Sequence, residues 1–172
     1  MIAIIAEKPS VGLDIARVVG ADTRNDGYCS GNGYMVTWAL GHLVSLAMPD
    51  TYGYTKTAAE DLPMLPDPFR LVSRQMRTDR GMVTDIAASK QLKVIESVFN
   101  RCDSIIVATD AGREGELIFR WIYDFLGCTK PFRRLWISSL TDEAIRKGLE
   151  ELKDGSEYDS LYAAADSRAK AD

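Results

Sequence analysis

The sequence lacks the features that mark membrane, secreted and disulfide-rich proteins. It has no run of about 18 apolar residues that could cross a membrane, and the apolar stretch Met1–Ala6 is too short for a secretion signal. The three cysteines, Cys29, Cys102 and Cys128, lie far apart without a CxxC pair, which is typical of free thiols rather than of disulfides or a zinc site. We therefore expect a cytoplasmic protein with no membrane partner.

Positive charge and histidine are also scarce. The 172 residues carry a net charge of −4, which gives no electrostatic basis for tight binding of nucleic acid by the chain as a whole. The only histidine is His42. No G-x-G-x-x-G follows the first apolar run, which argues against a nucleotide-binding module. Any contact with DNA must come from a local basic patch or from other parts of a larger protein.

Short apolar runs alternate with helical patterns along the chain. This alternation predicts an α/β fold with a central parallel sheet flanked by helices. The predicted strands are Ile2–Ala6, Ser104–Ala108 and Arg134–Ile137. The predicted helices run from Pro9 to Val19, through the periodic residues Leu92 to Phe99, over Leu117–Leu126, and from the N-cap Thr141 through Leu152.

Two segments do not fit this alternation. Residues Tyr28 to Leu40 predict an added hairpin with Gly31–Gly33 at the bend. Pro49 to about Arg80 holds four of the six prolines and little periodicity, which predicts an irregular excursion. Arg70, Arg74, Arg77 and Arg80 recur within it and predict either a basic stripe or, the interpretation we favour, a solvated face.

Carboxylates follow two of the predicted strands. Glu7 comes directly after the first strand and Asp110 shortly after the second, with Glu114 one helical turn further on. Ligands of parallel sheets bind beyond the carboxyl ends of the strands, so these side chains are expected at one edge. A cluster of oxygen ligands without His or Cys favours Mg²⁺. Caps and solvated turns are the alternative explanation, and the residues alone leave both open.

The same edge is suited to phosphate. Two predicted helices begin there, after Lys8 and after Gly112, and helix N-termini present free N–H groups to anions. Carboxylates, a metal ion, lysine and arginine at two helix starts form an arrangement suited to phosphoryl transfer.

Four segments in order resemble one family over nearly the whole chain. Ala6–Ser10 (AEKPS) and Ala108–Glu116 (ATDAGREGE) resemble the two Toprim signatures of type IA DNA topoisomerases, and the AEKPS form is more similar to topoisomerase III than to topoisomerase I. Gly41–Leu43 resembles the Gly-His motif of the family, and Arg134–Ile145 its following strand and helix. The resemblance implies a Rossmann-like Toprim fold.

The resemblance also implies roles for individual residues. Glu7 matches the Toprim glutamate that acts as general acid/base near the scissile phosphate, and Lys8 matches a lysine that contacts this phosphate. Glu7, Asp110 and Glu114 are the implied Mg²⁺ ligands, and Arg113 matches a residue beside the cleavage centre. His42 is implied near the DNA backbone, although a lone histidine is more often structural.

One position departs from the family pattern. The pattern is Asp-x-Asp-x-Glu, and glycine occupies its middle acid at Gly112. The departure leaves one carboxylate fewer for Mg²⁺, or it supplies backbone freedom where strand turns into helix. Of these two interpretations we favour loss of charge.

The domain organisation follows from the resemblance. Residues 1–155 are predicted to form the Toprim domain, and 156–172 the truncated start of the first helix of the next topoisomerase domain, where Arg168 contacts DNA. The family cleaves single-stranded DNA through a tyrosine that forms a 5′-phosphotyrosine, and no tyrosine here lies in a similar motif. We therefore expect an inactive fragment that binds single strands weakly and depends on the remaining domains of its polypeptide. The alternative is a Toprim metal-dependent nuclease or primase-like protein.

Overall fold

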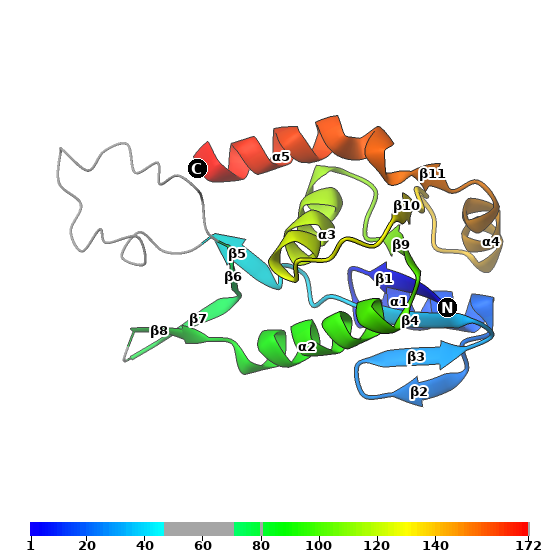
Figure 1. The fold of residues 1–172 in the computed structure, drawn as a ribbon, viewed down its shortest axis with the longest axis horizontal. Helices are drawn as coiled ribbons and strands as arrows, with labels where there is room; N and C mark the ends of the chain where they lie inside the picture. Colours follow the sequence, from blue (N-terminus) through cyan, green and yellow to red (C-terminus); the bar gives the residue numbers. More distant parts are fainter. Residues whose placement is uncertain (47–70, 80, 172) are drawn as a thin grey trace.

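The computed structural model describes residues 1–46, 71–79 and 81–171. Strands and helices alternate as expected, and two small two-stranded sheets add to the main sheet (Figure 1). The elements are β1 Ile2–Ala6, α1 Pro9–Val19, β2 Thr23–Asn25, β3 Tyr28–Gly31, β4 Tyr34–Trp38, β5 Val44–Leu46, β6 Leu71–Ser73, β7 Gln75–Thr78, β8 Gly81–Thr84, α2 Ile86–Arg101, β9 Ser104–Ala108, α3 Arg113–Phe125, β10 Phe132–Arg134, α4 Asp142–Glu150, β11 Lys153–Asp154, η3 Gly155–Tyr158 and α5 Asp159–Ala171.

The main sheet has seven strands in the order β11-β10-β9-β1-β4-β3-β2. Its centre is parallel, because β1 pairs in parallel with both β4 and β9, and β10 pairs in parallel with β9. The edge strands β2, β3 and β11 are antiparallel to their neighbours. The predicted α/β class and the mostly parallel sheet are confirmed, and the predicted hairpin is β3–β4 with its bend at residues 31–33.

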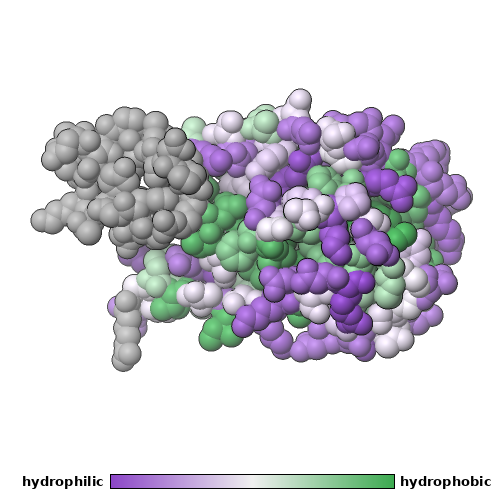
Figure 2. Space-filling view, in the orientation of Figure 1, coloured by the Kyte–Doolittle hydropathy of each residue, from purple (hydrophilic) through white to green (hydrophobic). Residues whose placement is uncertain are grey.

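Side chains alternate between the two faces of this sheet. Ala3 and Ile5 pack toward α2 and α3, whereas Ile4 and Ala6 pack toward α1 and α4. Helices therefore cover both faces, and α5 lies along α3 on the outer side (Figure 1). Apolar side chains also gather near the middle of the face drawn in Figure 2, between the polar outer surfaces of α5 and α2. No helix in the described part of the chain is long and apolar enough to cross a membrane.

Local signals predict the ends of the helices well. Gly20 ends α1 in the left-handed conformation at φ 84°, as glycine permits. Thr141 caps α4, because its hydroxyl accepts a hydrogen bond from the Ala144 N–H at 3.2 Å. Trp121 is 5% exposed in the core, as the helical stripe of α3 predicts.

The third core strand differs from the sequence prediction. The third core strand is Phe132–Arg134 rather than Arg134–Ile137. Arg134 lies opposite Val107 and β9 ends at Ala108, so residues after Leu135 have no neighbouring strand to pair with. Strand β2 was not predicted, because Thr23–Asn25 is exposed and carries no apolar pattern.

The excursion predicted for Pro49 to Arg80 is also wrong in its last part. Residues after 70 form β6 and β7, which pair antiparallel with β5 and β8. Residues 47–70 lie outside the described residues. The predicted boundary at residue 155 stays a prediction, and the helix predicted to follow it is present as α5.

Candidate active site

Glu7 and Asp110 meet at the carboxyl edge of the central strands. Ala6 of β1 lies opposite Ala108 of β9 in the parallel register, so the residues that follow both strands emerge side by side. The carboxylate Oε1 of Glu7 accepts a hydrogen bond from the Asp110 backbone N–H at 3.1 Å. The expectation that these two acids share one edge of the sheet is confirmed.

The environment of Glu7 favours its protonated form. Partial burial raises the pKa of the Glu7 carboxyl above its ordinary value, and the negative charge of Asp110 raises it further. The hydrogen bond from the Asp110 N–H and the charge of Lys8 oppose this shift without cancelling it. A carboxyl group with a raised pKa exchanges protons closer to neutral pH, as general acid/base chemistry requires.

A cleft of about 540 Å³ opens at this edge, between α3 and α5. It brings together six of the seven predicted site residues. Lys8 is not among its lining residues but is exposed beside it as the N-cap of α1. The lining consists of Glu7, His42, Asp110, Ala111, Gly112, Arg113, Glu114, Gly115, Leu117, Trp121, Ala165, Arg168 and Ala169.

His42 contacts Glu114, the third predicted metal ligand. Its Nε2 lies 2.9 Å from Oε2 of Glu114, and its ring meets the edge of Trp121 at a centroid distance of 6.4 Å. Arg74 secures the backbone at this point, because its guanidinium donates to the carbonyl oxygens of Leu40 and His42 at 2.7 and 3.1 Å. The histidine predicted near the DNA backbone therefore also has a structural contact within the site.

Arg74 consequently does not belong to a solvent-facing basic stripe. It forms an ion pair with Asp85 at 3.0 Å in addition to its two backbone contacts. Arg77 is exposed on β7, and Arg70 and Arg80 lie outside the described residues. The two described arginines, Arg74 and Arg77, therefore do not form a continuous basic stripe.

The acidic residues fit Mg²⁺ only in part. Within residues 1–46, 71–79 and 81–171, no group of three or more His, Cys, Asp or Glu side chains is gathered so as to hold a metal ion. The Glu114 carboxylate pairs with His42 at 2.9 Å. Glu7 and Asp110 remain as two adjacent oxygen donors, which suits an ion that keeps several waters. The predicted set of three ligands stays a prediction.

Gly112 has a backbone conformation that other residues rarely adopt. Its φ is 152° directly before the first residue of α3, and a Cβ added there would meet nothing within 4 Å. The space would accept a side chain, but the dihedral angle disfavours one. This observation supports backbone freedom as a reason for glycine, and the interpretation that loss of charge matters stays a prediction.

We expect Gly112→Asp to destabilise the folded chain by about 1–2 kcal/mol, because the new Cβ strains a positive φ. Gly112→Ala is the matched control, since it adds the Cβ without charge and should lower the melting temperature by a similar amount. Only the aspartate variant should bind Mg²⁺ more tightly in calorimetry. A fully stable Gly112→Ala chain would contradict the conformational explanation.

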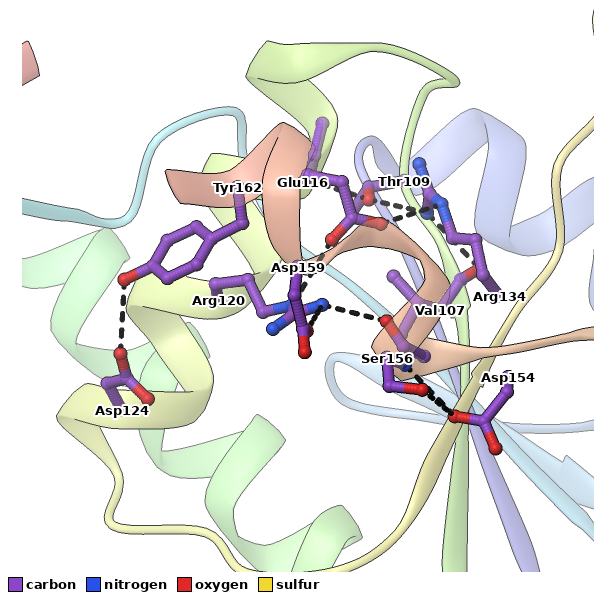
Figure 3. A network of polar contacts seen from close by, with 12 residues as sticks. Val107, Thr109, Glu116, Arg120, Asp124, Arg134, Asp154, Ser156, Asp159 and Tyr162 are labelled. Carbon is purple, nitrogen blue, oxygen red and sulfur yellow. Dashed lines mark hydrogen bonds and ion pairs between the residues drawn. The ribbon is translucent and has the colours of Figure 1, made fainter. Parts of the chain in front are cut away.

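Two buried charged residues escaped the sequence analysis. Arg134 and Glu116 are 1% and 2% exposed, and Arg134 Nε lies 3.1 Å from Glu116 Oε1. Figure 3 shows them inside a network that joins β9, α3, β10 and the start of α5. The missed signal is a second glutamate, two residues after Glu114, on the otherwise apolar inward face of α3.

Comparison with known families agrees with this geometry. The family model of the Toprim domain matches residues 2–140, which is most of the chain.

The chain belongs to the Toprim domain family.

Several curated relatives are similar to this Toprim domain over almost its full length. DNA topoisomerase 3 of Shouchella clausii is 49% identical over 99% of the chain. The proteins of the same name from Bacillus anthracis and Bacillus subtilis are 50% and 46% identical over 98% of it. The chain spans 22% of the length of each of these relatives.

A solved structure shows the same fold. Full-length topoisomerase I from Thermotoga maritima aligns with a TM-score of 0.52 at 18% identity, covering 88% of this chain and 21% of that one. At this identity the likeness concerns the fold alone.

Proposed function

We propose that this Toprim domain is the N-terminal part of a type IA DNA topoisomerase of the topoisomerase III type. The whole enzyme would cleave and rejoin single-stranded DNA without ATP and with Mg²⁺, through a 5′-phosphotyrosine made by a tyrosine outside these residues, and would relax or decatenate DNA. The observation that carries the proposal is the adjacent pair Glu7 and Asp110 at a cleft lined by Arg113 and Arg168. The similarity to relatives named DNA topoisomerase 3 supports it.

Glu7 is the proposed general acid/base. During cleavage it donates a proton to the leaving 3′ oxygen of the DNA, and during rejoining it accepts the proton again. Partial burial raises the pKa of the Glu7 carboxyl, which brings its proton exchange closer to neutral pH and supports this role. Lys8 and Arg113, both exposed at the starts of α1 and α3, are proposed to hold the scissile phosphate by charge.

Glu7 and Asp110 are the proposed core of an Mg²⁺ site, with Glu114 as a third ligand once it leaves His42. A bound Mg²⁺ supplies positive charge against the phosphate oxygens. His42 and Arg168 both line the cleft, and we propose that they contact the backbone of single-stranded DNA. We further propose a cytoplasmic enzyme, in line with its three free cysteines.

A chimaera tests this function. We would replace the matching segment of the Bacillus subtilis relative with this chain and assay negatively supercoiled plasmid. The chimaera should relax the plasmid with Mg²⁺ and without ATP, and EDTA should abolish relaxation. The 172-residue chain alone should leave the topoisomer ladder unchanged, because none of its tyrosines lies in a cleavage motif.

The same assay distinguishes this function from the alternative, a Toprim metal-dependent nuclease. Nicking of the plasmid by the purified chain alone with Mg²⁺ or Mn²⁺ would favour a Toprim nuclease. A folded chimaera without relaxation activity would contradict the proposal, as would relaxation by the isolated chain.

A further inference from the structure

Arg134 and Glu116 form a fully buried ion pair beneath the active-site cleft. Their side chains are 1% and 2% exposed. Burial lowers the pKa of the Arg134 guanidinium and raises that of the Glu116 carboxyl, and each partner's charge opposes the shift. Exchange of such a pair for apolar residues is often neutral or stabilising in other proteins. Stability alone is therefore a weak reason for these two charges.

The contacts of Arg134 lead to the catalytic edge. Its Nη1 lies 3.2 Å from the Val107 carbonyl oxygen and 2.9 Å from Thr109 Oγ1. Its Nη2 donates to the carbonyl oxygen of Asp110 at 2.7 Å. One guanidinium thus contacts three oxygen acceptors where the chain leaves β9, and Figure 3 shows those of Val107 and Thr109. A lysine ammonium lacks the planar fork needed to reach all of these acceptors at once.

Asp110 is consequently held on both sides of its backbone. Its N–H donates to Glu7 Oε1, and its C=O accepts from Arg134. Thr109 Oγ1 also donates to the Gly115 carbonyl at 2.8 Å, which ties the same segment to the first turn of α3. Loss of the guanidinium would remove one of the contacts that hold the segment carrying Asp110 beside Glu7.

We propose that Arg134 is a positioning residue that holds Asp110 against Glu7, and that the charge of Glu116, in an ion pair without hydrogen-bond geometry at Arg134 Nε, keeps its guanidinium in place. The effect of this placement of Asp110 on DNA cleavage rests on the proposed function, whereas the placement itself does not. The network continues outward, because Glu116 Oε2 lies 3.2 Å from Arg120 Nε. Arg120 then contacts the Gly155 carbonyl in η3 and Asp159 at the start of α5, both at 2.9 Å.

The amide resonance of Asp110 in the 172-residue chain reports on this position. Glu7→Ala provides the reference, because it removes the acceptor of the Asp110 N–H. In Arg134→Lys and in Glu116→Gln the Asp110 resonance should shift toward this reference. Its exchange with solvent should become about tenfold faster, the scale of one lost hydrogen bond. Amide protons of β9, such as that of Ile106, should stay protected from exchange with solvent. A general loss of structure would remove this protection as well.

A matched control breaks the network at its outer end. Asp159→Asn removes only the exposed partner of Arg120 and should leave the Asp110 resonance in place. In the chimaera, Arg134→Lys should lower kcat with little change in KM for DNA. Calorimetry with Mg²⁺ separates the proposed Mg²⁺ site from the proposed positioning role of Arg134. If the unmutated chain bound no Mg²⁺, the metal site would be contradicted, and the resonance test of Arg134 would still apply.

Two outcomes would overturn the proposal. One is an unchanged Asp110 resonance in folded Arg134→Lys and Glu116→Gln chains. The other is failure to fold by both Arg134→Lys and the double variant Arg134→Met with Glu116→Leu, which removes both charges together. That result would assign the pair to the stability of the fold.

Discussion

We expect Glu7→Ala in the chimaeric enzyme to lower the rate of DNA cleavage and rejoining by about a hundredfold or more, the contribution of a general acid/base. The fold should tolerate the change, because Glu7 is only half-buried at the end of β1 and accepts one described hydrogen bond, from Asp110. The melting temperature should therefore stay within a few degrees of the parent value. Gel assays of plasmid relaxation and thermal unfolding measure the two effects.

One further variant separates proton transfer by Glu7 from its hydrogen bond to Asp110, and a second serves as a control. Glu7→Gln retains an oxygen that accepts from the Asp110 N–H but cannot exchange a proton in the same way, so its activity should fall nearly as far. Glu96→Ala removes an exposed acid from α2, far along the chain from the cleft, and should leave the rate unchanged. Normal relaxation by Glu7→Ala, or its unfolding, would remove Glu7 from the catalytic role.

Gly115→Ala should damage both the fold and the site. A Cβ on Gly115 would lie 1.8 Å from the carbonyl oxygen of Asp110, which is backbone and cannot rotate aside. The segment carrying Asp110 would have to move, together with its contacts to Glu7 and Arg134. Overpacking of this kind costs about 3 kcal/mol. For a chain of this size, thermal unfolding should show a fall in melting temperature of roughly 10 °C.

Gly127→Ala is the matched control for this prediction. Gly127 has φ 63°, and a Cβ there would meet nothing within 4 Å. Its replacement should cost only about 1 kcal/mol, from backbone conformation. The comparison thus separates a steric clash from conformational strain. Equal stability losses for the two variants would show that the contact of Gly115 with Asp110 is looser than the structure indicates.

Regular local patterns allowed much of the fold to be predicted. The apolar runs at Ile2–Ala6 and Ser104–Ala108, and the caps Gly20 and Thr141, depend on neighbouring residues, and the structure confirms each of them. Prediction failed where pairing depends on distant partners. The strand expected at Arg134–Ile137 is shorter and earlier because its neighbour β9 ends, which no local pattern in this segment reveals.

By itself, the sequence determined the alternation of strands and helices, and it determined that Glu7 and Asp110 follow two strands. Parallel strands then bring their ends to one edge, so the proximity of these two acids could be predicted. Only the tertiary structure decided which side chain Glu114 contacts, that Gly112 has a positive φ, and that Arg134 and Glu116 pair beneath the site. The physical reason is that these features depend on contacts between residues far apart in the chain, or on a dihedral angle that such contacts impose.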